Sequence, residues 1–273
     1  MVIDFHTHIF PDRIAAKTIS HLSEKADISP FSDGTVDGLL ARMEESGVDL
    51  SVTLPVLTSP AQFESVNRFA AEINARFANA ERRLLSFAGI HPKCEDIEGK
   101  MQQIRESGFL GVKIHPDYQE TFINDEGYIR ILRAAKELDL IVVTHAGVDV
   151  GYPDAPVRCP PALVREVIER VRHPKLVLAH CGASEMFDEV CRLLCGLDVY
   201  LDTAYVLRFI GKDTFQKIIK THGADRMLFA SDSPWSSQRN DLAILRSFGL
   251  TPSEERQILS ENAMRLLGIR EGK

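Results

Sequence analysis

The stretch VIDFHTHIF, residues 2–10, joins a short apolar run to two histidines. The β-branched and aromatic side chains of residues 2–5 predict a short buried strand. Alternate residues of a strand share a face, so we expect the imidazoles of His6 and His8 to point the same way. Two polar rings at the end of a buried strand are costly to leave without partners. The stretch therefore predicts a strand whose carboxyl end carries a polar site.

Strand-like apolar runs of this kind recur along the chain, and segments with helical spacing separate them. Residues 35–47 carry apolar side chains on one helical face and end at Gly47. Residues 59–80 begin with Ser59 and Pro60, a favourable start for a helix. The runs are continuously apolar, as is typical of parallel strands covered on both faces. They lie at residues 2–6, 48–54, 84–90, 109–115, 139–145, 175–180, 197–202 and 226–231.

Eight strands that alternate with helices predict a (β/α)8 TIM barrel, a fold of the α/β class. The rival is an open doubly wound sheet, which usually carries a glycine-rich turn after its first strand, where this chain has HTHIFPD. We expect one domain over residues 1–273. Residues 252–269 have helical spacing and no strand follows them, so we expect an extra C-terminal helix that packs outside the barrel. The long segments 9–34 and 146–160 are expected to be loops that line a pocket.

Composition and charge exclude several classes of protein. The net charge of −7 and the pI near 5.7 argue against a protein that binds nucleic acid or an anionic membrane. No apolar stretch approaches the ~20 residues that a membrane span needs, and the N-terminus lacks the pattern of a signal peptide. The five cysteines include no CxxC pair, which is typical of free thiols in a reducing compartment. We therefore expect a cytoplasmic protein with a small-molecule substrate, and a homodimer stays open.

Histidines gather at the ends of the strand-like runs. Active-site residues of a (β/α)8 barrel lie at the carboxyl ends of its strands, and six of the nine histidines follow such runs. Asp232 follows the last run. Imidazole and carboxylate groups are ligands of first-row metal ions, so the pattern predicts a metal ion at this rim. The six are His6, His8, His91, His115, His145 and His180, while His21, His173 and His222 are expected at the surface.

The ordered set of histidines and aspartate resembles the metal-dependent barrels of the amidohydrolase superfamily. The resemblance rests on HxH after the first strand, histidines after the fifth and sixth strands, and aspartate after the eighth. Three further stretches are similar to the amidohydrolase-2 branch, which includes aminocarboxymuconate semialdehyde decarboxylase-like proteins. They are GVKIHPDYQ at 111–119, SDSPW at 231–235 and ILSENAMRLLGI at 258–269.

The resemblance implies one divalent metal ion, usually zinc, with manganese as an alternative. It makes His180 a residue beside the metal that acts as an acid or base or orients a carbonyl group. Asp232 is then both a ligand and a group that takes a proton from metal-bound water and returns it. In binuclear relatives a carboxylated lysine bridges two metals, so a second ion at Lys113 stays an alternative. The implied ligands are His6, His8, His145 and Asp232.

Four further residues are candidates for substrate contact. Lys113 and His115 share a face of one strand, so either side chain can approach the site. His91 and His115 each precede a proline, and for both a structural role stands beside substrate contact. Arg158 lies in the segment 146–160 and is a candidate clamp for a substrate carboxylate.

Two reactions fit the residues and the resemblance. The first is hydrolysis of a small-molecule ester, lactone or amide by metal-activated water. The alternative is non-oxidative decarboxylation of a conjugated or aromatic acid. Members of the decarboxylase type tend to be longer than this chain, which favours hydrolysis. A barrel that binds without turnover is a third hypothesis, and a TatD-type nuclease, which usually carries glutamate where this chain has Lys113, is a fourth.

Overall fold

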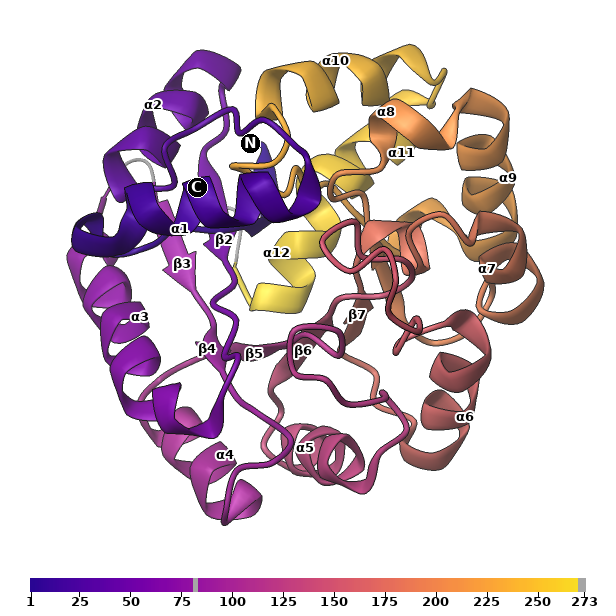
Figure 1. The fold of residues 1–273 in the computed structure, drawn as a ribbon. Coiled ribbons are helices and arrows are strands. Elements are labelled where there is room, and N and C mark those ends of the chain that lie inside the picture. The colour runs from indigo at the N-terminus through magenta and orange to yellow at the C-terminus, as the bar shows by residue number, and fades with distance from the viewer. Residues whose placement is uncertain (81–82, 270–273) are drawn as a thin grey trace.

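Parallel strands form a ring that helices surround (Figure 1) in the computed structural model, which describes residues 1–80 and 83–269. The strands pair in chain order as two sheets, β1-β2-β3 and β4 to β9, all parallel. They are β1 (Ile3–Thr7), β2 (Leu50–Thr53), β3 (Arg83–Ser86), β4 (Ala88–Gly89), β5 (Gly111–Ile114), β6 (Ile141–Thr144), β7 (Leu176–Leu178), β8 (Tyr200–Asp202) and β9 (Met227–Leu228).

Two places join the sheets into one barrel. Only Phe87 separates β3 from β4, and its N–H donates to the carbonyl of Thr53 at 3.0 Å, so these segments form one barrel strand. At the other junction the N–H of Phe5 in β1 donates to the carbonyl of Phe229, directly after β9, at 2.9 Å. The eight predicted strands therefore close into a (β/α)8 barrel, and the prediction of this fold is confirmed.

The helices follow the predicted alternation, with α1 and the short α8 in addition. The predicted caps are present, since Gly47 ends α2 with φ of 73° and Ser59 Oγ accepts from the N–H of Ala61 at 3.2 Å at the start of the turn that leads into α3. Helix α1 lies inside the predicted loop 9–34, because its buried residues are only Ala15 and Ile19, too sparse a pattern to predict a helix. The helices are α1 (Asp12–Ala26), α2 (Val36–Ser46), α3 (Phe63–Phe77), α4 (Ile97–Glu106), α5 (Glu126–Glu137), α6 (Pro161–Val171), α7 (Phe187–Leu193), α8 (Leu207–Ile210), α9 (Lys212–His222), α10 (Gln238–Ser247), α11 (Pro252–Arg256) and α12 (Asn262–Leu267).

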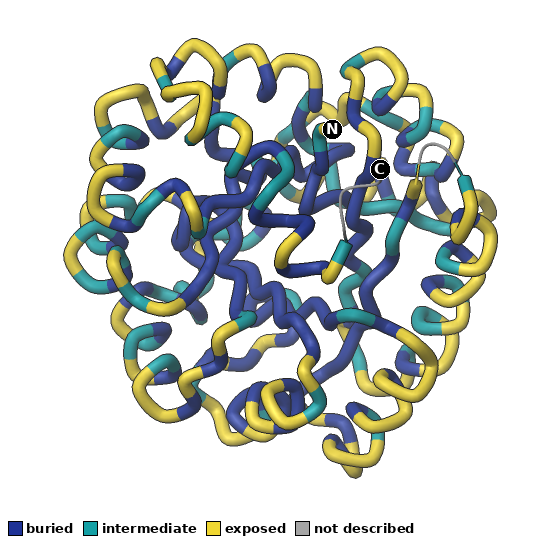
Figure 2. Tube along the Cα trace, turned by 180° about the vertical axis from the view of Figure 1, so that it is seen from behind, coloured by how far each residue is buried: buried dark blue, intermediate teal, exposed yellow. Residues whose placement is uncertain are grey.

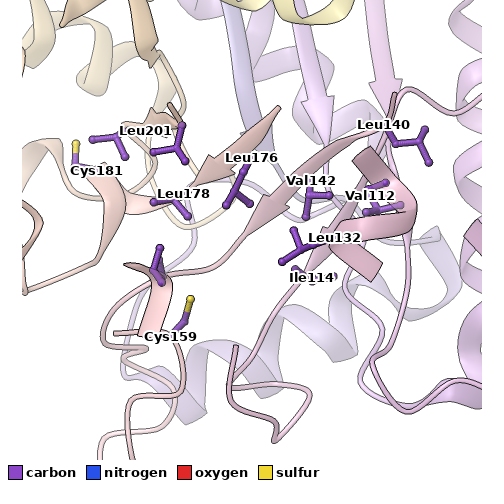
Figure 3. Packing of buried hydrophobic residues seen from close by; sticks show 14 of the residues in the cluster. Val112, Ile114, Leu132, Leu140, Val142, Cys159, Leu176, Leu178, Cys181 and Leu201 are labelled. Atoms are coloured by element: carbon purple, nitrogen blue, oxygen red, sulfur yellow. The ribbon is translucent and has the colours of Figure 1, made fainter. Parts of the chain in front are cut away.

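Strands such as β6 and β7 send alternate side chains to two different apolar clusters, an outer one and an inner one. In β5, Val112 and Ile114 face outward and pack with Leu132 of α5 (Figure 3). Lys113 lies between them in the chain and faces the inside of the barrel, where it meets His6 of β1. The inner cluster fills the barrel interior toward its amino-terminal end with side chains such as Phe5 and Val143. The polar residues that follow occupy the carboxyl end of the same interior.

The C-terminal helix does not pack outside the barrel, so this prediction is wrong. The buried side chains of α12, among them Met264, Leu266 and Leu267, belong to the inner cluster, together with Ile3 and Leu228. In Figure 1 α12 lies within the ring formed by the other helices. Residues at the starts of strands are its neighbours, so it covers the amino-terminal end of the barrel. The apolar face of the segment predicts a helix but does not specify which surface it covers.

Two of the three histidines expected at the surface are buried. His173 donates from Nε2 to the carbonyl of Leu140 at 2.9 Å, and His222 donates from Nε2 to the carbonyl of Val199 at 3.1 Å. His21 is exposed, as predicted. Figure 2 shows the buried residues in the middle of the molecule and the exposed ones around the outer helices. The five cysteines are free thiols.

No helix of the described residues combines the length and the apolar character needed to cross a membrane.

Candidate metal centre

Three predicted ligands converge at the carboxyl end of the barrel. Nε2 of His6 lies 3.2 Å from Nε2 of His8, and Oδ1 of Asp232 lies 3.4 Å and 3.1 Å from these two nitrogens. The N–H of Asp232 donates to the carbonyl of His6 at 2.8 Å, so the hydrogen bonds that close the barrel also bring the carboxylate to the histidines. A shift of register between Asp4 and Thr7 lets β1 turn the ring of His6 inward directly after Phe5.

The hydrogen-bond partners of both rings leave a nitrogen lone pair directed into this group. Nδ1 of His8 donates to the carbonyl of Leu54 at 2.8 Å, and a carbonyl can only accept. Nδ1 of His6 lies 2.9 Å from a carboxylate oxygen of Asp202. A second partner of this kind is what orients histidines that ligate metals. The Nε2 atoms of His6 and His8 are therefore the acceptors, as metal ligation requires.

The group fits one divalent ion. Ligand atoms about 2.1 Å from a tetrahedral ion lie about 3.4 Å from one another, close to the separations of His6, His8 and Asp232. Burial, with the nearby charge of Lys113, lowers the pKa of His6 well below its usual value, so its ring is neutral and able to ligate. Two imidazoles and one carboxylate are a ligand set of catalytic zinc sites, which keep a fourth position open.

Lys113 competes with a metal ion for His6. Its side chain is wholly buried, and Nζ lies 3.0 Å from Nε2 of His6. Burial lowers the pKa of Lys113 to about 8, while the carboxylate of Asp202 opposes this shift. The ammonium donates to the lone pair that an ion would use. Ion binding at His6 therefore requires Lys113 to lose its proton, to move, or to become carboxylated as in the binuclear alternative.

His145 and His180 form a pair beside the group. Nδ1 of His180 donates to the carbonyl of Ala204 at 2.9 Å, so its Nε2 accepts from Nδ1 of His145, also at 2.9 Å. The rings of His6 and His180 lie 5.5 Å apart between centroids. His145 does not share the cluster of His6, His8 and Asp232. Ligation of the same ion by His145 stays a prediction, and it requires a different proton position on that ring.

A buried aspartate that the sequence reading missed positions both sides of the site. Oδ1 of Asp202 accepts from the N–H groups of His180 and Ala204 at 2.9 Å and 3.0 Å, while Oδ2 faces His6. His180 has φ of 60° and Asp232 has φ of 69°, a left-handed conformation that costs energy in residues other than glycine. The position of Asp202 in the sequence could have identified it, since it is the last residue of the strand-like run 197–202, and the predicted site residues also lie at the ends of such runs.

The residues predicted to contact the substrate lie in different surroundings near the cluster of His6, His8 and Asp232. The ring of His115 stacks on that of His145, with centroids 4.2 Å apart and an interplanar angle of 11°. Nη1 of Arg158 is buried and lies 3.6 Å from Oδ1 of Asp117. Nδ1 of His91 accepts from the N–H of Lys93 at 3.1 Å, a local contact that does not join it to the group. Substrate contact by His91, His115, Lys113 and Arg158 stays a prediction.

Further residues near His115 were missed by the sequence reading. Oδ2 of Asp149 lies 3.4 Å from Nε2 of His115, and Tyr118 packs edge-on against the His115 ring at 4.3 Å. The ammonium of Lys25, at the end of α1, lies 3.2 Å from the centre of the Tyr152 ring. Helix α1 thus meets the segment 146–160 next to the site. No periodic pattern predicts these contacts, because they join the segment 146–160 to residues that are distant in the chain.

Comparison with known proteins supports the superfamily. The model of the amidohydrolase-2 family, described as amidohydrolase, matches residues 3–269. No curated protein matches the sequence significantly.

Many solved structures are similar to the chain, and three illustrate the range. A TIM-barrel protein of unassigned function from Bordetella bronchiseptica has a TM-score of 0.74 at 16% identity, covering 98% of each chain. For 5-carboxyvanillate decarboxylase from Sphingomonas paucimobilis the TM-score is 0.65 at 15% identity, over 98% of this chain and 99% of that one. For dihydroxybenzoic acid decarboxylase from Polaromonas, with bound manganese and an inhibitor, the TM-score is 0.69 at 14% identity, over 99% of this chain and 98% of that one. At these identities the likeness establishes the fold.

Proposed function

The chain belongs to the amidohydrolase family, and from this premise we propose that it is a metal-dependent decarboxylase of a conjugated or aromatic acid. The observation that carries the proposal is the cluster of His6, His8 and Asp232, set beside the buried His145–His180 pair at the carboxyl end of the barrel. Decarboxylases of phenolic acids share this barrel. The sequence favoured hydrolysis because the chain is compact, but the likeness extends over 98–99% of those decarboxylases, so length does not separate the two reactions.

We propose zinc or manganese as the ion, held by His6, His8 and Asp232. Manganese is supported by the dihydroxybenzoic acid decarboxylase, which binds it, and zinc by the nitrogen-rich set of ligands. A bound divalent ion supplies positive charge that draws electrons from an oxygen of the substrate.

Side chains of this chain would move the proton that decarboxylation needs. The bond between the substrate carbon and its carboxylate breaks, its electron pair stays on that carbon, the carbon gains one proton, and carbon dioxide leaves. We propose His180 and Asp232 as the groups that hold this proton. Nε2 of His180 accepts from His145, so its protonation state is coupled to the second ring of the pair. Burial lowers the pKa of His180 to about 4, which makes a proton on this ring easy to give up.

Hydrolysis of an ester, lactone or amide is the second candidate. It is favoured by the position of Asp232, whose Oδ1 lies within 3.4 Å of both ligand nitrogens, where it can take a proton from water in the open position. The same residues therefore serve either reaction, and the substrate decides between them.

The test loads purified protein with zinc or with manganese and measures two products. Carbon dioxide release is followed with a panel of phenolic and conjugated carboxylic acids, and acid release is followed with a panel of esters, lactones and amides. We expect carbon dioxide from at least one acid, abolished by His8→Ala and unchanged in the exposed control His21→Ala. Turnover of esters or lactones without any decarboxylation would instead support the second candidate, and turnover that persists in His8→Ala would contradict both.

A further inference from the structure

Asp4 lies in β1, and nothing in the proposed function uses its side chain. Its neighbours Ile3 and Phe5 belong to the inner cluster, so the carboxylate of Asp4 points to the outer side of the barrel, where it meets α10 and is wholly buried. We propose that Asp4 is a positioning residue that holds Asp232 in the orientation that metal binding needs. This inference rests on the ligand role of Asp232 in the proposed function.

Hydrogen-bond donors surround the carboxylate of Asp4. Its Oδ1 accepts from the N–H groups of Ser231 and His6 at 2.9 Å and 3.3 Å. Its Oδ2 accepts from the hydroxyl of Ser231 at 2.5 Å and from Nε2 of Gln238 at 2.7 Å. An ionised carboxylate only accepts and has enough lone pairs for all these donors. Ser231, which directly precedes Asp232, is therefore bound to Asp4 through both its backbone and its side chain.

Ser231 connects Asp4 to the residue on the other side of Asp232. Oγ of Ser231 accepts from the N–H of Ser233 at 3.0 Å. The carbonyl of Ser233 accepts from the N–H of His8 at 2.6 Å. Both neighbours of Asp232 in the chain are therefore fixed relative to β1, the strand that leads into the two histidines of the cluster.

The backbone of Asp232 depends on contacts of this kind. Its φ of 69° lies in the left-handed region, and a residue with a side chain keeps such a conformation only where its surroundings impose it. The position of Oδ1, 3.1 Å from Nε2 of His8 and 3.4 Å from Nε2 of His6, follows from that conformation. When Ser231 loses its bonds to Asp4, the backbone of Asp232 is free to relax and the carboxylate leaves the two nitrogens.

Gln238 connects the same carboxylate to the helix that follows Asp232. Nε2 of Gln238, the first residue of α10, also lies 3.2 Å from Oγ of Ser51 in β2, and its Oε1 accepts from the hydroxyl of Ser46 at the end of α2 over 3.4 Å. The segment that carries Asp232 is thus held at its start through Ser231 and at its end through Gln238. Asp4 accepts from both, so one buried carboxylate fixes the two ends of this segment.

The affinity for Zn²⁺ tests the proposal without any enzymatic assay. Protein stripped of metal competes for Zn²⁺ with a chromophoric chelator. Asp4→Asn fills the same space, but its amide has one acceptor oxygen and one donor nitrogen, so it cannot accept from all the donors. We expect the affinity to fall about 10–100-fold, the scale for partners that orient ligands. In an Asp232→Asn background the same change should lower the affinity by no more than about twofold, because both changes remove one interaction.

Asn262→Ala is the matched control. Asn262 is as buried as Asp4, and its Nδ2 donates to the carbonyls of Ala224 and Met227 at 2.8 Å and 2.7 Å, at the start of β9 rather than after its end. We expect a lower thermal midpoint with unchanged affinity for Zn²⁺. Ser231→Ala removes only a hydroxyl and replaces Asp4→Asn if that variant does not fold, with an expected fall in affinity of about tenfold.

Three outcomes would overturn the proposal. Unchanged affinity in Asp4→Asn, or in Ser231→Ala where the first variant does not fold, would show that the carboxylate does not act on the site. An equal loss with and without Asp232→Asn would mean that Asp4 acts on the histidines or on the whole fold. A loss in Asn262→Ala as large as in Asp4→Asn would make the effect one of general stability.

The proposed function and this inference fail in different measurements. Absence of Zn²⁺ binding by the unchanged protein would refute the proposed ion together with the role of Asp4. Absence of decarboxylation would leave every affinity in this experiment unaffected. Unchanged affinity in the variants of Asp4 and Ser231 alone would refute only the positioning role.

Discussion

Oδ2 of Asp202 accepts a hydrogen bond from Nδ1 of His6 over 2.9 Å, although the two residues are 196 positions apart in the chain. The same carboxylate accepts from the backbone of His180. One buried side chain therefore fixes the ring of a proposed metal ligand and the backbone of a proposed proton carrier.

Replacing Asp202 by asparagine tests this positioning role. The amide oxygen can still accept one bond, but the negative charge that supports His6 is lost. We expect metal affinity to fall about 10–100-fold, the usual scale for such outer partners. Competition with a chromophoric chelator measures it. Asp213→Asn, at an exposed position, serves as the control and should bind metal unchanged. Equal metal affinity in the two variants would show that Asp202 does not position the metal ligands.

Replacing His180 by asparagine separates proton transfer from metal binding. His6, His8 and Asp232 already supply three protein ligands, so His180 is not needed to hold the ion. We expect turnover of the identified substrate to fall about 10²–10⁴-fold, the range for loss of a general acid or base, with metal content unchanged. Elemental analysis and kcat measured on the same sample check both parts. A variant that loses its metal would show that His180 is a ligand.

Buried His173 and His222 should make the fold sensitive to acid. Burial lowers the pKa of each to about 4, from the usual 6.5, so the unfolded chain binds more protons between these values. Their contribution to the free energy of unfolding is complete above pH 6.5 and declines as pH falls toward 4, by up to about 3 kcal/mol for each residue. Urea unfolding of His173→Gln, followed between pH 7 and pH 4.5, should show a shallower decline than the unchanged protein.

The exposed His21 provides the matched control for that experiment. His21→Gln should keep the full decline, because the ring of His21 lies in solvent on α1. If both variants show the same pH dependence, His173 is not a source of it, and the acid sensitivity belongs to other groups.

The cover formed by α12 should contribute strongly to stability. Leu266 and Leu267 are each 6% exposed and pack with the inner cluster at the amino-terminal end of the barrel. We expect Leu267→Ala to lower the free energy of unfolding by about 2–5 kcal/mol, since it leaves a cavity in a packed interior. Ile14→Ala, at a 43% exposed position of α1, should change it by no more than about 0.5 kcal/mol. Chemical denaturation measures both, and similar values would mean that α12 is not part of the core.

Much of the fold and part of the site follow from local patterns. Continuous apolar runs determine the strands, and residues such as Thr35 and Ser59 mark where helical structure begins. Because parallel strands of a barrel end on one rim, residues that directly follow strands meet there whatever the details of packing. This is why His6, His8 and Asp232 could be grouped from the sequence, and the structure brings these three side chains together, while their ligation of an ion stays a prediction.

Tertiary structure alone decided the rest, because the remaining features depend on atoms that are distant in the chain. The periodicity of α12 does not reveal whether its apolar face meets the outside or the end of the barrel. The burial of His173 depends on a carbonyl of the preceding strand–helix unit, and the role of Asp202 depends on a ring in β1. The direction of the His145 ring, set by His180, places its lone pair toward Asp117 and Asp149. A sequence specifies which face of an element a side chain occupies, whereas the partner of each polar atom is set by the stagger of the strands and the rotation of the rings.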